Sequence, residues 1–126
     1  MKPLLSSLFA ALFTAATLFA ASDIPGSQDF VGTWLRPDGG YKLVVKAVNS
    51  DGKADVEYLN PSPIHVAEAS VTEVDGKATL FVKLEDEGYP GSNYHLVASD
   101  AGERLTGTYF QAAAKETYDI FFVREK

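Results

Sequence analysis

Residues 67–84, AEASVTEVDGKATLFVKL, contain the clearest structural signal in the chain. Apolar and polar side chains alternate on both sides of Asp75-Gly76, a pair typical of two-residue hairpin turns. With the turn placed there, three apolar pairs face each other on one side of the hairpin: Val71 and Leu80, Ala69 and Val82, Ala67 and Leu84. A shift of one residue would move all of them to the opposite face. The stretch therefore predicts an antiparallel hairpin with one buried face.

Two further turns predict the same kind of pairing. A four-residue loop at 49–52 (NSDG) would bring together Ala47 and Ala54, Val45 and Val56, and Leu43 and Tyr58. A loop at 100–103 (DAGE) would bring together Ala98 and Leu105, Leu96 and Gly107, and Tyr94 and Tyr109. Because three independent turns agree on one inward face, the register is a firm expectation.

The whole pattern predicts an all-β domain of eight antiparallel strands. The expected ranges are 30–35, 41–48, 53–60, 65–74, 77–85, 93–99, 104–111 and 117–124. Consecutive strands with short links favour an up-and-down barrel, which removes exposed sheet edges. A β-sandwich is the alternative, because strands of this length serve both folds.

The N-terminus is typical of an export signal. Lys2 precedes an apolar segment from Leu4 to Phe19, and Ala20 offers a small residue for cleavage. We divide the chain into a signal peptide at 1–20, a short polar lead at 21–29 and a β-barrel domain at 30–126. Cleavage would place the protein in the periplasm or outside the cell. If the segment is retained, it would instead anchor the barrel to a membrane, because Leu4 to Ala21 just reaches the spanning length.

Composition argues against several classes of function. The formal net charge is −6 at pH 7, which disfavours nucleic-acid binding. The absence of cysteine excludes disulfides, thiolate metal sites and a cysteine nucleophile. His65 and His95 lack the spacing of a zinc site, and the acidic run at 85–87 is typical of a solvated loop. We expect no cofactor, no metal and no enzymatic activity.

The aromatic residues gather at one end of the predicted barrel. In an up-and-down barrel the loops near 36–40, 60–64, 86–92 and 112–116 share an end, and four prolines shape them. Inward aromatic residues lie at the same end: Trp34, Tyr41, Tyr58, Tyr94, Tyr109 and Tyr118. Asn60 and Asn93 are the polar rim residues that we expect beside them. The rings would either fill the barrel or line a pocket for a small, partly apolar ligand.

The outward face carries apolar residues as well: Val44, Val48, Phe81, Val97, Phe110, Phe121 and Val123. Phe110, Phe121 and Val123 belong to neighbouring strands and could form a patch for self-association or for a protein partner.

The segment Gly32-Thr33-Trp34 resembles the Gly-x-Trp signature of lipocalins and the Gly-Thr-Trp opening of avidin-like proteins. Both families are eight-stranded barrels that bind small ligands at one end. The chain lacks the disulfides of many lipocalins and the several tryptophans of avidins. Three other segments resemble small exported bacterial proteins of uncharacterised function: residues 58–61, 89–94 and 105–111.

These resemblances imply an exported small-ligand-binding barrel. The alternative is a structural or accessory subunit, membrane-tethered if residues 1–20 are retained, that acts through its outer apolar patch.

Overall fold

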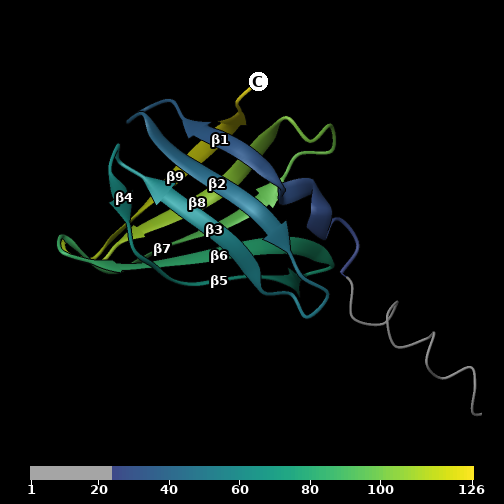
Figure 1. Cartoon of the computed structure of the whole chain (residues 1–126), viewed down its shortest axis with the longest axis horizontal. Coiled ribbons are helices and arrows are strands. Elements are labelled where there is room, and N and C mark those ends of the chain that lie inside the picture. Colours follow the sequence, from purple (N-terminus) through teal and green to yellow (C-terminus); the bar gives the residue numbers. More distant parts are fainter. Residues whose placement is uncertain (1–23) are drawn as a thin grey trace, which may run out of the picture.

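The computed structural model describes residues 24–126, and they form one nine-stranded antiparallel sheet curled into a nearly closed barrel (Figure 1). A 3-10 helix, η1 (Ser27–Phe30), precedes the strands β1 (Gly32–Arg36), β2 (Tyr41–Val48), β3 (Ala54–Leu59), β4 (Pro63–Ile64), β5 (Val66–Val74), β6 (Lys77–Asp86), β7 (Tyr89–Ala98), β8 (Arg104–Gln111) and β9 (Glu116–Arg124). The predicted signal peptide at 1–20 lies outside the described residues.

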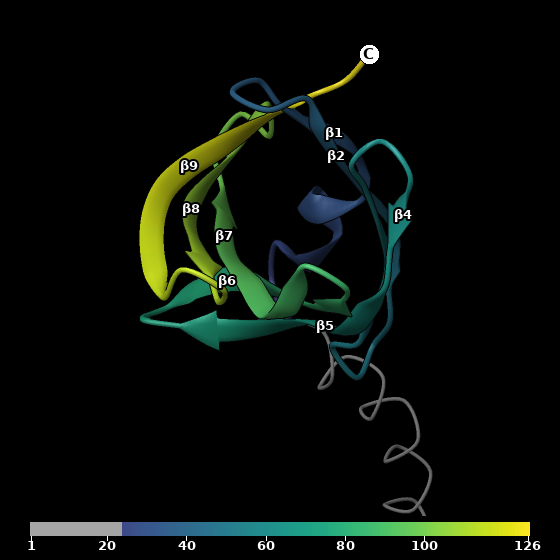
Figure 2. The same ribbon diagram turned by 90° about the vertical axis from the view of Figure 1, so that its left-hand side faces the viewer.

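The sheet order is β4-β3-β2-β1-β9-β8-β7-β6-β5. The ring closes where β5 meets β3, through a bridge between Lys53 and Ser70 and a 2.7 Å hydrogen bond from the Val71 N–H to the Gly52 carbonyl. Figure 2 shows the strands around a central space, with η1 at its far end. The predicted barrel is confirmed, and the alternative of a β-sandwich is wrong because a single sheet curls on itself.

The strand count is nine rather than the predicted eight. The additional strand, Pro63–Ile64, lies in the predicted loop at 60–64 and pairs with β3, whereas the expected strand at 65–74 forms as Val66–Val74 and pairs with β6. The His65 N–H bonds the Asp86 carboxylate at 2.8 Å, and its carbonyl accepts the Glu85 N–H at 3.0 Å. A two-residue strand is too short to produce a detectable alternation, which is why the sequence did not reveal it.

Most of the predicted register is confirmed. The turn at Asp75-Gly76 forms with positive φ at both residues, and Val71 faces Leu80 and Ala69 faces Val82. All three predicted pairs of β7 and β8 form: Tyr94–Tyr109, Leu96–Gly107 and Ala98–Leu105.

Val45–Val56 and Leu43–Tyr58 also form as predicted, and two bulges change one predicted pair each. A bulge between Val66 and Glu68 makes Val66, not Ala67, the partner of Leu84. Another between Val45 and Ala47 makes Val48, not Ala47, the partner of Ala54. Val48 is consequently buried with 7% of its surface exposed, so its expected outward position is wrong.

The turn between β6 and β7 is shorter than predicted. Asp86 pairs with Tyr89, which leaves only Glu87 and Gly88 in the turn instead of a loop over 86–92. Gly91, inside the predicted loop, has a positive φ of 92° and lies within β7, where the register with β6 shifts.

One end of the barrel is packed and closed. Leu80, Leu96, Leu105 and Phe122 are fully buried there. The η1 helix adds Phe30, also fully buried, and the Trp34 indole N–H donates to the Phe30 carbonyl at 2.9 Å.

Arg124, the last residue of β9, stabilises the closed end of the barrel. Its guanidinium lies 4.2 Å from the centre of the Trp34 ring. It also donates to the carbonyls of Gly102 (2.9 Å), Val31 (3.0 Å) and Asp29 (3.0 Å). One side chain therefore ties β9 to η1, to the start of β1 and to the loop before β8.

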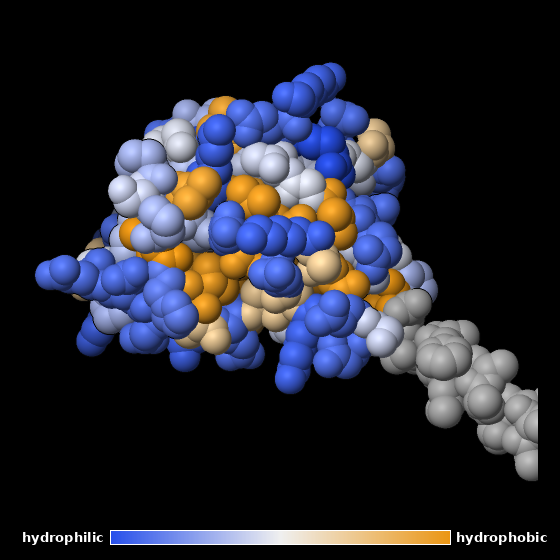
Figure 3. Space-filling model, viewed as in Figure 1, coloured by the Kyte–Doolittle hydropathy of each residue, from blue (hydrophilic) through white to orange (hydrophobic). Residues whose placement is uncertain are grey.

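The outer surface mixes apolar and charged side chains (Figure 3). Across β2 and β3, Lys46 and Glu57 form an ion pair at 2.8 Å.

On β9, Phe121 is 37% exposed and lies under the Arg104 guanidinium at 4.2 Å. Phe121 pairs with Thr106, and Phe110 pairs with Thr117. Phe110 therefore lies four positions along β8 from the partner of Phe121. From residue 24 onward, the chain forms no helix with the length and apolar character to cross a membrane.

Candidate functional site

A cavity of about 500 Å³ occupies the other end of the barrel. The alternation of β2, β3, β8 and β9 places Tyr41, Tyr58, Tyr109 and Tyr118 on its wall. Tyr89 joins them from the first position of β7. The remaining lining residues are Arg36, Asp38, Gly88, Gln111, Asp119 and Ile120.

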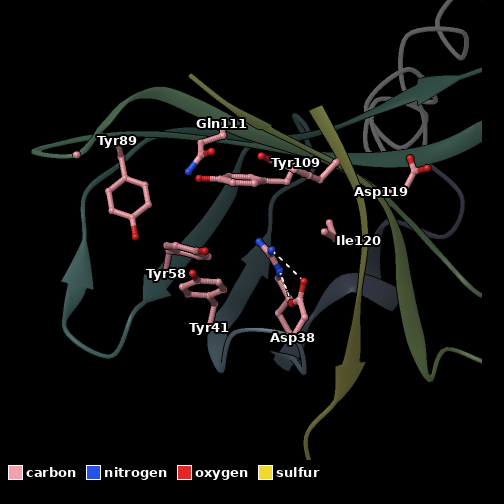
Figure 4. Close-up of a pocket in the computed structure, with 11 residues that line it drawn as sticks. Asp38, Tyr41, Tyr58, Tyr89, Tyr109, Gln111, Asp119 and Ile120 are labelled. Atoms are coloured by element: carbon pink, nitrogen blue, oxygen red, sulfur yellow. Dashed lines mark hydrogen bonds and ion pairs between the residues drawn. The ribbon is translucent and has the colours of Figure 1, made fainter. Parts of the chain in front are cut away.

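Five tyrosine rings form one connected cluster: those of Tyr41, Tyr58, Tyr89, Tyr94 and Tyr109. Tyr58 is its centre, with ring centroids 6.0 Å from Tyr41 in a stacked pair, 6.4 Å from Tyr89 edge to face, and 5.6 Å from Tyr94. The Tyr94 ring lies 4.6 Å from Tyr109 and 5.3 Å from Phe122 at the start of the packed end. Figure 4 shows Tyr41, Tyr58, Tyr89 and Tyr109 around one space. The cavity therefore has a largely aromatic wall above a filled lower barrel.

A charged group lies within this aromatic cluster. The Arg36 side chain is only 11% exposed, and its guanidinium carbon is 4.8 Å from the Tyr41 ring centre and 5.3 Å from that of Tyr109. Its Nε and Nη2 donate to the two Asp38 carboxylate oxygens at 2.7 and 3.1 Å. Such a bidentate pair fixes the plane of the guanidinium.

A chain of hydrogen bonds leads from Arg36 to the cavity wall. Arg36 Nη1 donates to the Tyr94 hydroxyl at 2.8 Å, and the Tyr94 and Tyr58 hydroxyl oxygens are 2.8 Å apart. At the rim, the Asn60 side-chain amide donates to the Tyr89 hydroxyl. Within the described residues, no buried side-chain nitrogen or oxygen lacks a partner.

The ionisation states follow from this environment. Burial is the largest influence on Arg36 and lowers its pKa, but the combined attraction of Asp38 and Tyr94 raises the pKa above its ordinary value. Burial raises the pKa of Tyr58 well above its usual range and that of Tyr94 to about 12. Burial also raises the pKa of Tyr109. At neutral pH the site thus contains one cationic guanidinium, its Asp38 counter-ion and neutral phenols.

The eight residues predicted as a ligand site separate into three groups. Tyr41, Tyr58, Tyr109 and Tyr118 line the cavity, and Tyr118 is 42% exposed with its hydroxyl donating to Glu116 at 2.6 Å. Asn60 and Tyr94 lie behind the wall, where each bonds a residue that faces the cavity.

Trp34 and Asn93 form the third group, because neither lines the cavity. Trp34 is fully buried at the closed end, beneath Arg124. Asn93 alternates with the inward Tyr94 and donates to the Gly91 carbonyl at 3.1 Å. The polar residue that faces inward near this position is Ser92, fully buried, whose hydroxyl accepts the Ala112 N–H at 3.0 Å.

Sequence reasoning did not identify Arg36, Asp38, Tyr89 and Gln111 as site residues. Arg36 is two residues beyond Trp34, so the period of β1 already places it on the inward side. Its assignment to the predicted loop at 36–40, outside the predicted strand at 30–35, concealed this signal. Tyr89 was assigned to the predicted loop at 86–92, which is longer than the two-residue turn in the structure.

No metal centre is formed by the described residues. Between residues 24 and 126 there is no group of three or more histidine, aspartate or glutamate side chains arranged to hold an ion. In the acidic run, Asp86 accepts the N–H groups of His65 and Glu87, both at 2.8 Å. These two hydrogen bonds hold the pKa of Asp86 below its usual value.

Neither a known protein family, nor a curated protein, nor a solved structure matches the chain.

Proposed function

We propose that the protein binds a small, partly apolar molecule in the tyrosine-lined cavity. The observation that carries this proposal is the uneven filling of the barrel: one end is packed with aliphatic and aromatic side chains, and the other holds a cavity of about 500 Å³. Small-molecule sites typically have volumes of about 300–1,000 Å³. The lining of this cavity is more polar than the mostly apolar walls of such sites, and its polar groups can orient a ligand. The Arg36–Asp38 pair and the phenol hydroxyls are such groups. Binding rather than catalysis is the proposal.

The test is a ligand screen on the folded domain, observed by NMR of selectively labelled tyrosines. A ligand that enters the cavity shifts the ring signals of Tyr41, Tyr58 and Tyr109. The Trp34 indole signal serves as the internal control, because that ring is buried at the closed end beneath Arg124. Ligands that shift only resonances outside the cavity, or a screen without any binder, would contradict the proposal.

Export is a second part of the proposal, and it rests on the N-terminal sequence alone. Residues 1–20 would direct the chain across a membrane, and the barrel would act in the periplasm or outside the cell in the manner of lipocalins or avidin-like proteins. N-terminal sequencing of the protein recovered from cells tests this. A mature chain that begins near residue 21 is expected, and an intact N-terminus on a cytoplasmic protein would refute it.

A further inference from the structure

The part of the cavity wall around Arg36 and Tyr58 carries several hydrogen-bond donors, and these donors indicate the chemistry of the ligand. Arg36 carries five N–H donors and no acceptor. Among the described residues, two of them bond Asp38 and one bonds Tyr94. Two N–H groups of a guanidinium that lines the cavity remain for a ligand or for water.

The direction of the hydroxyl chain adds another donor. The Tyr94 oxygen accepts from Arg36, so its own hydrogen needs a different partner. Tyr94 is fully buried, and a buried hydroxyl without a partner is costly. The acceptor within reach is the Tyr58 oxygen at 2.8 Å. Tyr94 therefore donates to Tyr58, and the Tyr58 hydrogen is left to face the cavity that this residue lines.

Tyr89 contributes in the same way from the rim. Its oxygen accepts the Asn60 amide, so its hydroxyl hydrogen is also free. Figure 4 shows Tyr89 and Gln111 pointing into the space beside Tyr58, whereas Asp119 lies on the far side of Ile120. The Gln111 amide supplies both a donor and an acceptor. The tyrosine part of the cavity thus combines one cationic group with several phenol donors.

A cationic ligand does not fit this arrangement. Clusters of tyrosine rings attract cations through their faces, and the acidic chain would favour a cation at long range. The faces of Tyr41 and Tyr109 are already next to the Arg36 guanidinium. A second cation would displace the protein's own or lie against it. Asp38, which could serve as counter-ion, already uses both carboxylate oxygens for Arg36.

We infer that the cavity selects a ligand with an aromatic or other flat apolar body and a carboxylate or similar anionic oxygen group. The oxygens would accept from the free N–H groups of Arg36 and from the Tyr58 hydroxyl, and the body would lie among the tyrosine rings. This inference rests on the proposed function and makes it specific to one charge class. Asp38 competes with the ligand for the same guanidinium and so limits its affinity.

The test is a matched series of three probes measured by calorimetry at pH 7: 2-naphthoate, 2-naphthamide and protonated 2-naphthylmethylamine. The three share a ring system and differ in the charge of one substituent. We expect 2-naphthoate to bind at least about tenfold more tightly than the amine, because the carboxylate accepts charge-assisted bonds from Arg36, whereas the ammonium group is repelled by it. Arg36→Met should lower the affinity for 2-naphthoate about 10- to 100-fold, and it should leave the affinity for the amine unchanged or raise it.

Two variants refine the test. Asp38→Asn removes the competing charge from an exposed side chain and should raise the affinity for 2-naphthoate several-fold. Arg104→Met removes the same charge from the outer face, where Arg104 covers Phe121, and should change no affinity by more than about twofold.

The outcomes separate this inference from the proposed function. Equal or tighter binding of the amine, at the tyrosines, would overturn the inference and leave a binding cavity in place. The inference would also be overturned, with the binding cavity left in place, if Arg104→Met lowers the affinity for 2-naphthoate as much as Arg36→Met does. The preference for the anion would then be a long-range charge effect. If none of the three probes binds at millimolar concentration, both proposals fail. If Arg36→Met does not fold, the order of the three probes on the wild-type protein and the gain in Asp38→Asn still decide the matter.

Discussion

Tyr94→Phe is the substitution that most directly tests the hydrogen-bond chain of the site. It removes one oxygen and retains the ring, whose contacts with Tyr109 and Phe122 are unchanged. The lost bonds are one from a charged donor, Arg36, and one to Tyr58, both at 2.8 Å. Bonds to charged groups contribute about 1.5–3 kcal/mol and neutral ones about 0.5–1.5 kcal/mol. Water in the cavity can accept the Arg36 hydrogen bond in place of the Tyr94 hydroxyl. We therefore expect a net destabilisation of about 2 kcal/mol.

The assay is urea denaturation at pH 7, followed by circular dichroism. A loss of about 2 kcal/mol lowers the midpoint by roughly 1 M urea without changing the slope. Tyr118→Phe is the matched control, since it removes a phenol oxygen whose partner, Glu116, is exposed. That variant should lose less than about 0.5 kcal/mol. Equal losses in the two variants would refute the hydrogen-bond chain as a stabilising element.

A double-mutant cycle makes the test specific. If Arg36 and Tyr94 interact as the distances indicate, the losses from Arg36→Met and Tyr94→Phe should fall short of additivity by about 1 kcal/mol or more. Strict additivity would mean that the 2.8 Å contact between the guanidinium and the hydroxyl contributes nothing to stability.

Three further predictions concern the barrel. Arg124→Met should cost about 3 kcal/mol and shift the Trp34 emission to longer wavelength, because three carbonyl bonds and a ring contact are lost at the closed end; an unchanged spectrum and urea midpoint would contradict this role. Gly107→Ala should prevent accumulation of folded protein, measured by circular dichroism and soluble yield, since its Cβ would lie 1.8 Å from a backbone oxygen of β7; normal folding would show that β7 and β8 can separate. Raising the pH should leave stability constant up to about 10 and then reduce it, because burial raises the pKa of Tyr94 to about 12 and that of Tyr58 above its usual range, so the folded state holds these protons more tightly than the unfolded chain. The loss should reach up to about 1.4 kcal/mol per pH unit for each group between the two pKa values, and Tyr94→Phe should reduce that slope in urea titrations at pH 8, 10 and 11.

Much of the fold was predictable because the strands alternate and the turns carry distinct signals. Asp75-Gly76 indicated both the position and the register of one hairpin, and the pairs next to the turn form as predicted. The errors lie where a bulge inserts one residue, at Leu84 far from the Asp75-Gly76 turn and directly beside the 49–52 turn, where Val48 takes the place of Ala47. Neither Val66 nor Val48 differs in type from its neighbours in a way that marks a bulge, so the pattern was extended unchanged past each one.

The site was predictable in location but not in chemistry. Inward tyrosines at strand ends indicated the aromatic end, because period-2 alternation assigns their faces directly. Arg36 was overlooked because a charged residue beside a loop is normally solvated. Its burial depends on Asp38, two residues away, and on Tyr94, 58 residues away, which together supply three hydrogen bonds. Partners so distant in sequence can be recognised only once β1 and β7 are placed around one barrel.

The opening of the cavity follows from one residue of the loop after β1. Pro37 has no N–H and cannot extend the strand ladder, and β1 ends at Arg36. Within the described residues, β1 pairs with β9 only at Trp34–Arg124 and Leu35–Val123. The first half of β9 therefore extends beyond β1, and a hollow lies there between Pro37, Asp38, Asp119, Ile120 and Phe121. The same short strand that brings Arg36 into the aromatic cluster thus leaves a gap in the barrel wall beside it. The hollow and the tyrosine-lined cavity share Asp38, Asp119 and Ile120 as lining residues, so the two spaces adjoin beside the Arg36–Asp38 pair.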